Sequence, residues 1–298
     1  MPLPETHAYR SFPPSDNYHV EPTNDKIVTS GLIYHLDAAN QASYPGSGDQ
    51  WYDLVNGPSV YPTTIRSYAY TTYTWPHYSL LAGGCLEFVA DYYHYWPADD
   101  QIHFGPGHYG TCDFLTGFDP NNWTVEVFVM ESQWADPYYA GADPYYQALV
   151  TDLGQGSAIQ GPQFFLGCIG SSPIDVGFYD YDTELWYLSY AGAGFPGSTY
   201  YGWYSSQKYT WHQIAGSYGD GTLTLSVDGA NINSYYAGIT QSVYTRYGFR
   251  MMTGFTDDIV GYKFYPGNLA IVRMYNRALT ADEILQNYTA QMPRFQNY

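Results

Sequence analysis

The sequence predicts an all-β protein, an antiparallel sandwich of two sheets with one short helix near the C-terminus. Three observations support this fold class. Residues 222–227 alternate strictly between polar and apolar side chains, as a strand with one buried face does. Many other short apolar segments are separated by loops rich in Gly, Pro, Asn and Asp. No helices are predicted between these segments, which argues against a parallel sheet with crossover helices.

The first 26 residues are predicted to form a separate N-terminal arm, which precedes a sandwich over residues 27–298. The arm is rich in proline, which favours an extended or irregular chain. We expect the arm either to be disordered or to dock on a neighbouring copy of the protein.

Two further segments show the alternation of a strand. They are residues 31–37 and residues 123–130, and in the second Val125, Val127 and Val129 share one face. These valines are therefore expected to point into the core.

A hairpin is predicted from residues 211–218 and 222–227, because Gly219-Asp220-Gly221 supplies the turn between them. Additional strands are predicted over residues 84–90, 147–153, 163–169, 184–190, 247–254 and 267–275.

The only predicted helix follows Thr280. Thr280 and Glu283 have the spacing of a capping box, in which two side chains satisfy free backbone N–H groups. Ile284 and Leu285 then contribute to an apolar face, and Pro293 ends the segment. We expect this helix to pack over the edge of the sandwich.

The composition excludes several classes of function. Aromatic residues make up 19% of the chain, with 36 tyrosines, whereas charged residues make up only 13%. The 28 acidic residues outnumber the 10 basic ones, which gives a net charge of −18. This balance disfavours binding to nucleic acid or to anionic membranes, both of which depend on Lys and Arg. The aromatic content argues against a disordered chain.

The cysteines and the N-terminus predict where the protein folds. Cys85, Cys112 and Cys168 form no disulfide framework and no metal-binding pair, so buried reduced thiols are expected. We expect no signal peptide and no membrane insertion, because no basic start precedes an apolar stretch and no apolar run is long enough to span a bilayer. Folding in a reducing cytoplasm is the resulting prediction.

Three segments together resemble a known family. The first is residues 31–54, which read Gly-Leu-Ile-Tyr-His-Leu-Asp at the start and Trp-Tyr-Asp-Leu at the end. The other two are residues 211–229 and residues 268–295. The chain resembles the laminin-G-like branch of the concanavalin A-like lectin and glucanase superfamily over most of residues 27–296. The resemblance implies a jelly-roll sandwich of two curved antiparallel sheets.

The opening and closing motifs are most similar to those of members in bacteriophage virion proteins and bacterial surface proteins. The resemblance therefore implies a virion component, with other copies of the chain or other virion proteins as partners. The sequence departs from the average member in long Tyr-rich insertions, at residues 61–80, 91–118 and 134–146.

Catalysis is not predicted. Glycosidases of this superfamily carry an E-x-D-x-x-E strand, and none of the seven glutamates of this chain stands in that order. Glu126 and Glu131 are five residues apart, so a regular strand would point them to opposite faces. A glycoside hydrolase remains only as a remote alternative.

Two groups of residues are candidates for ligand binding, because an aromatic platform beside carboxylates suits a sugar. The candidates are Tyr92, Tyr93, Trp96, Asp99, Asp100, Trp134, Tyr138 and Tyr139. Tyr and Trp also anchor protein interfaces, and such rings can simply cover loops. Trp51, Trp123 and Trp211 lie at strand starts within the family pattern and are expected in the core.

No cofactor is predicted, and calcium is the one ion that the residues would suit. Asp99-Asp100 and Asp257-Asp258 are the candidate metal ligands, because calcium prefers carboxylate oxygens. The alternative is that each acidic pair keeps a loop solvated.

Two classes of function follow from the sequence. The first is a non-enzymatic virion structural protein, a capsid decoration or a tail or fibre component, whose lectin-like sandwich serves assembly and glycan attachment. The second is a carbohydrate-binding protein of a cell surface or an extracellular filament.

Overall fold

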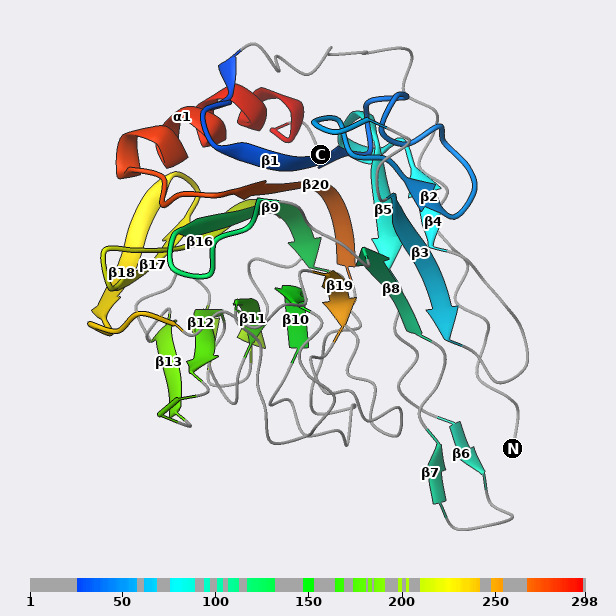
Figure 1. Cartoon of the computed structure of the whole chain (residues 1–298). Coiled ribbons are helices and arrows are strands. Elements are labelled where there is room, and N and C mark those ends of the chain that lie inside the picture. Colours follow the sequence, from blue (N-terminus) through cyan, green and yellow to red (C-terminus); the bar gives the residue numbers. More distant parts are fainter. Residues whose placement is uncertain are drawn as a thin grey trace.

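The computed structural model describes most of the sandwich. The described residues are 26–57, 62–68, 76–88, 94–96, 101–103, 107–112, 117–131, 147–152, 164–168, 174–180, 182–183, 185–190, 198–199, 202–203, 210–241, 248–253 and 267–296. They form two eight-stranded sheets in which every strand pair is antiparallel, as predicted (Figure 1).

Sheet A contains both ends of the sandwich sequence. Its order is β18 (Ala230–Tyr236), β17 (Thr222–Val227), β16 (Trp211–Gly219), β9 (Trp123–Glu131), β20 (Gly267–Tyr275), β5 (Cys85–Phe88) and β4 (His77–Ser79), with β1 (Leu32–Asp37) also paired to β20.

Sheet B contains most of the middle of the chain. Its order is β13 (Leu185–Tyr190), β12 (Asp175–Asp180), β11 (Phe165–Cys168), β10 (Gln147–Asp152), β19 (Phe249–Thr253), β8 (Gly107–Cys112), β3 (Thr63–Tyr68) and β2 (Gln50–Trp51). Two small hairpins are separate from both sheets: β6 (His94–Trp96) with β7 (Gln101–His103), and β14 (Ser198–Thr199) with β15 (Gly202–Trp203).

The main core lies between the two sheets. Val125, Val127 and Val129 point into it from β9, as the alternation predicts, and Leu223 and Leu225 do so from β17. Burial of this apolar surface is the main force that holds the sheets together.

The helix α1 (Ala281–Gln291) covers the outer face of sheet A, where Figure 1 shows it beside β1 and β20. Its capping box is present as predicted: Glu283 N–H bonds the Thr280 hydroxyl, and the Glu283 carboxylate accepts from Thr280 N–H. Ile284 packs against Tyr275 under the helix. Two short 3₁₀ segments, η2 (Leu81–Gly83) and η5 (Met292–Arg294), complete the helical elements of the described residues. No helix in this part of the chain is long and apolar enough to cross a membrane.

The predicted strands are confirmed, including the hairpin of β16 with β17. The sequence missed several strands, among them β3, β4 and β8, which lie inside residues 61–80 and 91–118. These two segments were expected to be insertions between the strands of the sandwich, and that expectation is wrong in part because they supply strands to both sheets. Residues 134–146 lie outside the described residues.

Candidate functional site

Most of the binding residues predicted from the sequence lie outside the described residues. Only Trp96 falls in a described strand, at the end of β6, and its side chain is not described. The others lie outside the described residues: Tyr92, Tyr93, Asp99, Asp100, Trp134, Tyr138, Tyr139, Asp257 and Asp258. They stay predictions, both as ligand contacts and as calcium ligands.

Glu126 is no candidate for acid–base chemistry. Its carboxylate is fully buried in an ion pair with Arg273, with 3.0 Å between Oε1 and Nη1. It also accepts hydrogen bonds from the amides of Gln213 at 3.1 Å and Asn287 at 2.7 Å. With these three donors under α1, the carboxylate is closed off from any substrate.

A second buried ion pair lies on the same side of sheet A. Arg294 Nη1 is 2.7 Å from Asp37 Oδ1, and His35 accepts from Arg273 Nε at 3.3 Å. Burial, and then the charges of Arg273 and Arg294, hold the pKa of His35 well below its usual value. These groups fasten the C-terminal segment to the sheet, so we assign them a structural role.

The thiols and potential metal ligands of the described residues form no reactive centre. Cys85 and Cys112 are buried reduced thiols, as predicted for both. Burial raises the pKa of Cys85 to about 12, so its thiol is protonated at neutral pH. No group of three His, Cys, Asp or Glu side chains that could hold a metal ion occurs within this part of the chain.

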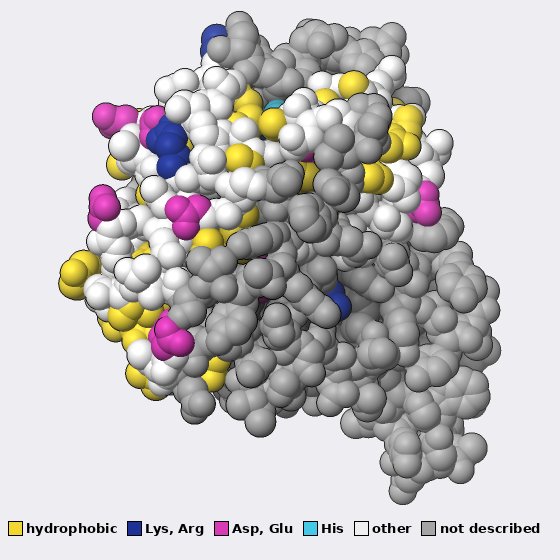
Figure 2. All heavy atoms as spheres, viewed as in Figure 1, with side chains coloured by type: hydrophobic (Ala, Val, Ile, Leu, Met, Phe, Trp, Pro, Cys, Tyr) yellow, Lys and Arg dark blue, Asp and Glu magenta, His cyan; other side chains and the backbone are white. Residues whose placement is uncertain are grey.

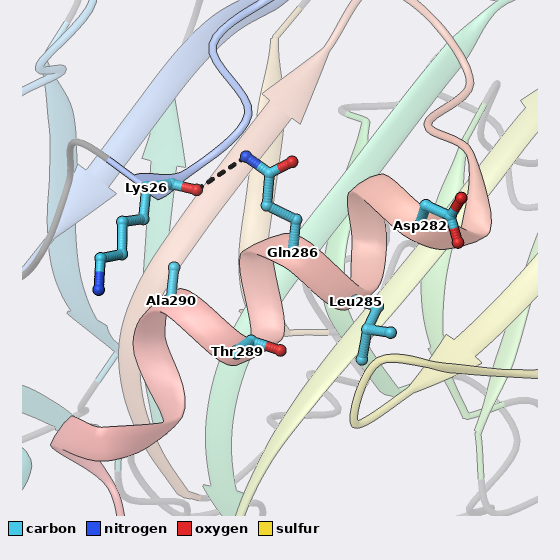
Figure 3. A pocket seen from close by; sticks show the side chains of 6 residues that line it. All are labelled: Lys26, Asp282, Leu285, Gln286, Thr289 and Ala290. Atoms are coloured by element: carbon cyan, nitrogen blue, oxygen red, sulfur yellow. Dashed lines mark hydrogen bonds between the residues drawn. The ribbon is translucent and has the colours of Figure 1, made fainter.

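A shallow depression lies on the outside of α1 (Figure 3). Its lining residues are Lys26, Asp282, Leu285, Gln286, Thr289 and Ala290. The Gln286 side-chain amide donates to the Lys26 carbonyl, and the depression is open to solvent. It lacks the convergent polar groups of a ligand site.

A stronger candidate lies at the rim of the sandwich, and we call it the rim cluster. It consists of Asp180, Thr183, Tyr187, Tyr218 and Tyr236. These residues come from the end of β12, the turn that follows, β13, β16 and the end of β18. The cluster is built where sheet A and sheet B meet, since β12 and β13 contact β16, β17 and β18.

Tyr236 provides an exposed ring on a rigid base. The residue is 72% exposed, and its ring rests on the backbone of two glycines. A Cβ atom at Gly238 would lie 2.9 Å from one edge of the ring, and one at Gly221 would lie 3.2 Å from the other edge. Both glycines have positive φ, which suits the turns that hold the ring. The ring is therefore held in place while the rest of its surface faces solvent.

Asp180 provides a buried carboxylate, one oxygen of which meets no donor in the described part of the chain. The residue is only 3% exposed, and its Oδ2 accepts from the N–H and hydroxyl of Thr183 at 2.9 and 2.6 Å. Its Oδ1 is buried and finds no donor among the described residues. An unpartnered buried oxygen is costly, so it is a place where a hydroxyl donor would stabilise the protein.

Tyr218 and Tyr187 contribute two hydroxyl groups to the cluster. The Tyr218 hydroxyl donates to the Ile239 carbonyl, and the Tyr187 hydroxyl lies 3.5 Å from that of Thr183. Burial, and then the neighbouring Asp180, Tyr187 and Tyr236, raise the pKa of Tyr218 to about 12. Asp180, Tyr187 and Tyr236 are thus close enough to the Tyr218 hydroxyl to influence its pKa.

The cluster combines an aromatic face with hydroxyl and carboxylate groups, and it contains no basic side chain. This chemistry suits a neutral ligand with several hydroxyl groups. The sequence analysis did not single out these residues, because they come from five separate elements. The one local signal was the pair Tyr235-Tyr236 followed closely by Gly238.

The Laminin_G_3 family, described as the concanavalin A-like lectin/glucanases superfamily, matches residues 104–285, more than half of the chain and all of the rim cluster. No curated protein matches the chain in sequence.

Solved structures of the same fold include domain 4 of AbnA, a GH43 extracellular arabinanase from Geobacillus stearothermophilus, in complex with arabinotriose. Its TM-score is 0.53 at 12% identity, and 87% of this chain and 98% of that chain are covered. The receptor binding domain of botulinum neurotoxin type G has a TM-score of 0.51 at 11% identity, with 88% of this chain covered and 52% of that chain. This chain thus spans about half the length of the neurotoxin domain. At these identities the likeness shows the fold alone.

Proposed function

We propose a function for this chain from the premise that it belongs to the concanavalin A-like lectin/glucanase superfamily, as the match over residues 104–285 shows. The function is non-enzymatic binding of a neutral saccharide at the rim cluster. The observation that carries the proposal is that the exposed ring of Tyr236, held on glycine backbone, and the carboxylate of Asp180, whose Oδ1 meets no donor among the described residues, both lie near the Tyr218 hydroxyl.

The chemistry of the cluster supports a saccharide over other small ligands. The C–H groups of a sugar ring stack on an aromatic face, and its hydroxyls donate to carboxylate and hydroxyl oxygens. The hydroxyls of Thr183 and Tyr187 would then fix the orientation of the sugar. An anionic sugar would meet an acidic cluster on a protein of net charge −18, so a neutral sugar is preferred.

The fold gives a precedent for this use. Domain 4 of the arabinanase is in complex with arabinotriose, so a sandwich of this shape can hold a saccharide. The botulinum neurotoxin domain is a receptor-binding domain. Both support a binding role, and neither identifies the ligand of this chain.

A binding role without catalysis agrees with the state of Glu126. Glu126 lies near the centre of β9, and its carboxylate is occupied by the buried ion pair with Arg273. Glycoside hydrolysis needs two accessible carboxylates about one sugar apart. A hydrolase therefore stays a remote alternative.

The setting that we propose is a virion, in which the chain is a capsid decoration or a tail or fibre component. The support is the resemblance of residues 31–54 and 268–295 to bacteriophage virion proteins and bacterial surface proteins, together with an acidic balance that keeps a densely displayed protein soluble. Proteomic analysis of purified particles should find the chain at structural copy number. Its absence from particles, with a monomer in the host cytosol, would favour the alternative of a cell-surface or filament-forming protein.

Replacing Tyr236 tests the binding site. A glycan array should show binding to neutral glycans by the wild-type protein, and Tyr236→Ala should weaken it by about tenfold, a loss of about 1.4 kcal/mol of binding free energy. Tyr52→Ala is the matched control, because Tyr52 is a half-buried tyrosine next to β2, at the opposite end of sheet B from β13. An array without hits, or equal losses in both variants, would refute saccharide binding at the rim cluster.

A further inference from the structure

The saccharide site proposed above depends on a loop that is not itself part of the rim cluster. Residues 237–241 follow β18, and we call them the support loop. Gly238 of this loop lies against the Tyr236 ring, and the Ile239 carbonyl accepts the hydrogen bond of the Tyr218 hydroxyl. The same short loop therefore holds two of the five residues of the rim cluster.

The support loop has little packing of its own to hold its backbone in place. It leaves β18 on the side of the sandwich where β18 and β13 end the two sheets (Figure 1), and Figure 2 shows apolar side chains exposed over that side. Ala237 and Ile239 pack against the main core, whereas Gly238 and Thr240 are exposed. The two packed side chains determine which face of the loop is buried. The position of its backbone depends on hydrogen bonds.

Hydrogen bonds hold the support loop at both ends. At its start, the N–H groups of Ala237 and Gly238 donate to the Gly221 carbonyl at 2.8 and 3.0 Å. At its end, the Asn121 side chain bonds both backbone groups of Gln241. Its Oδ1 accepts from the N–H at 2.5 Å, and its Nδ2 donates to the C=O at 3.1 Å. Paired strands exchange the same two kinds of bond, and here a single side chain makes both.

The turn that carries Asn121 is itself well anchored. The Asn121 N–H donates to the Asp119 carboxylate at 2.9 Å. The buried side chain of Gln241 returns a bond to the same turn, from its amide to the Pro120 carbonyl at 2.6 Å. Directly after the turn, Trp123 begins β9 and is fully buried in the main core. Asn121 therefore connects the support loop to a segment that is fixed by the core.

We propose that Asn121 is a positioning residue for the saccharide site, which acts through the support loop on the ring of Tyr236. Without the two bonds of Asn121, only the side chain of Gln241 ties this end of the loop to the turn. The ring is then held for binding in a smaller fraction of the molecules, and the apparent affinity falls by that fraction. The inference rests on the proposed function, because it assigns a role in saccharide binding.

Titration of the full chain with a neutral glycan that binds on the array tests this role. Asn121→Ala should weaken binding by about fivefold, the effect expected from losing the net contribution of one ordinary hydrogen bond. Asn122→Ala is the matched control, because the Asn122 side chain also accepts from a backbone N–H, that of Ala278 at 2.6 Å. That bond fastens the approach to α1 and not the support loop, so Asn122→Ala should leave binding unchanged.

Two further measurements separate positioning from a general loss of structure. If Asn121 acts through the ring, the double variant with Tyr236→Ala should bind about tenfold more weakly than the wild-type protein, as Tyr236→Ala alone does. Independent effects would multiply to about fiftyfold. Native-state hydrogen exchange should also become faster at the amides of Ala237 and Gly238 in Asn121→Ala and stay unchanged in Asn122→Ala.

The outcomes distinguish this inference from the proposed function. An array without hits for the wild-type protein would refute saccharide binding and the positioning role together. Saccharide binding would stand, and the role of Asn121 would be overturned, if Asn121→Ala weakened binding no more than Asn122→Ala does. Losses that multiply in the double variant would overturn that role as well.

Discussion

Gly238 determines whether Tyr236 can present its ring. Its φ of +69° is strained for any residue with a Cβ atom, and a Cβ there would lie 2.9 Å from the ring. We expect Gly238→Ala to push the ring away from its base and to weaken saccharide binding by about tenfold. It should also lower the free energy of unfolding by about 1 kcal/mol through backbone strain. Glycan binding and denaturant unfolding measure the two effects.

A substitution at Gly57 separates the effect of backbone strain from the effect of contact with the Tyr236 ring. It also has positive φ, but a Cβ there would meet nothing within 4 Å. Gly57→Ala should therefore cost a similar amount of stability and leave saccharide binding unchanged. If both variants lost binding equally, support of the ring by glycine would not be the cause.

Single residues differ in how well the sequence predicts them. Trp51, Trp123 and Trp211 are buried as expected, because a large ring at the start of a core strand has few other places to go. Tyr236 could not be singled out among 36 tyrosines. Its role depends on contacts with Gly221 and Gly238, which come together only when β16, β17 and β18 have formed.

A buried ion pair within sheet A, between Arg273 of β20 and Glu126 of β9, lies under the C-terminal helix α1, whose Asn287 amide donates to the same carboxylate. Arg273→Met would leave Glu126 charged and buried without its cation, which should lower the free energy of unfolding by about 3–5 kcal/mol. The double variant with Glu126→Gln should recover much of this loss, because no unpaired charge then remains. Urea unfolding of the single and double variants measures the coupling between the two side chains.

The neighbouring pair of Arg277 and Glu283 is the control for this effect. It has the same chemistry and a distance of 2.7 Å, but each side chain keeps about a quarter of its surface in solvent. Arg277→Met should therefore cost only about 1 kcal/mol or less. Equal losses for Arg273→Met and Arg277→Met would contradict the importance of burial.

The elements that the sequence predicted are those whose local pattern agrees with their environment. The capping box of α1 and the alternation in β9 and β17 are examples. By contrast, β12 was missed because Asp stands at both of its ends and Gly177 interrupts it. That glycine is required by close packing, since a Cβ there would lie 2.3 Å from the Tyr187 carbonyl oxygen. The strand β18 was missed because an exposed edge shows no apolar alternation.

The free energy of unfolding of the whole molecule should depend on pH because of the buried groups beneath the C-terminal segment. His35 faces Arg273 and Arg294, which are themselves paired with Glu126 and Asp37. The pKa of His35 is lowered in the folded protein, so below about pH 6.5 the unfolded chain binds a proton that the folded chain does not. The contribution of His35 to the free energy of unfolding should be fully present above that pH. Below it, the free energy of unfolding should fall by up to about 1.4 kcal/mol per pH unit.

Histidine variants can assign this loss of stability. The free energy of unfolding, measured between pH 7.5 and pH 5, should show a flatter dependence for His35→Gln, whose amide oxygen can still accept from Arg273 while taking up no proton. His77→Gln is the control, because His77 is exposed on β4, and it should keep the slope of the wild-type protein. The carboxylates contribute at lower pH, where Arg277 holds the pKa of Glu283 at about 2. A wild-type slope that persists in His35→Gln would therefore show that another group carries the loss above pH 5.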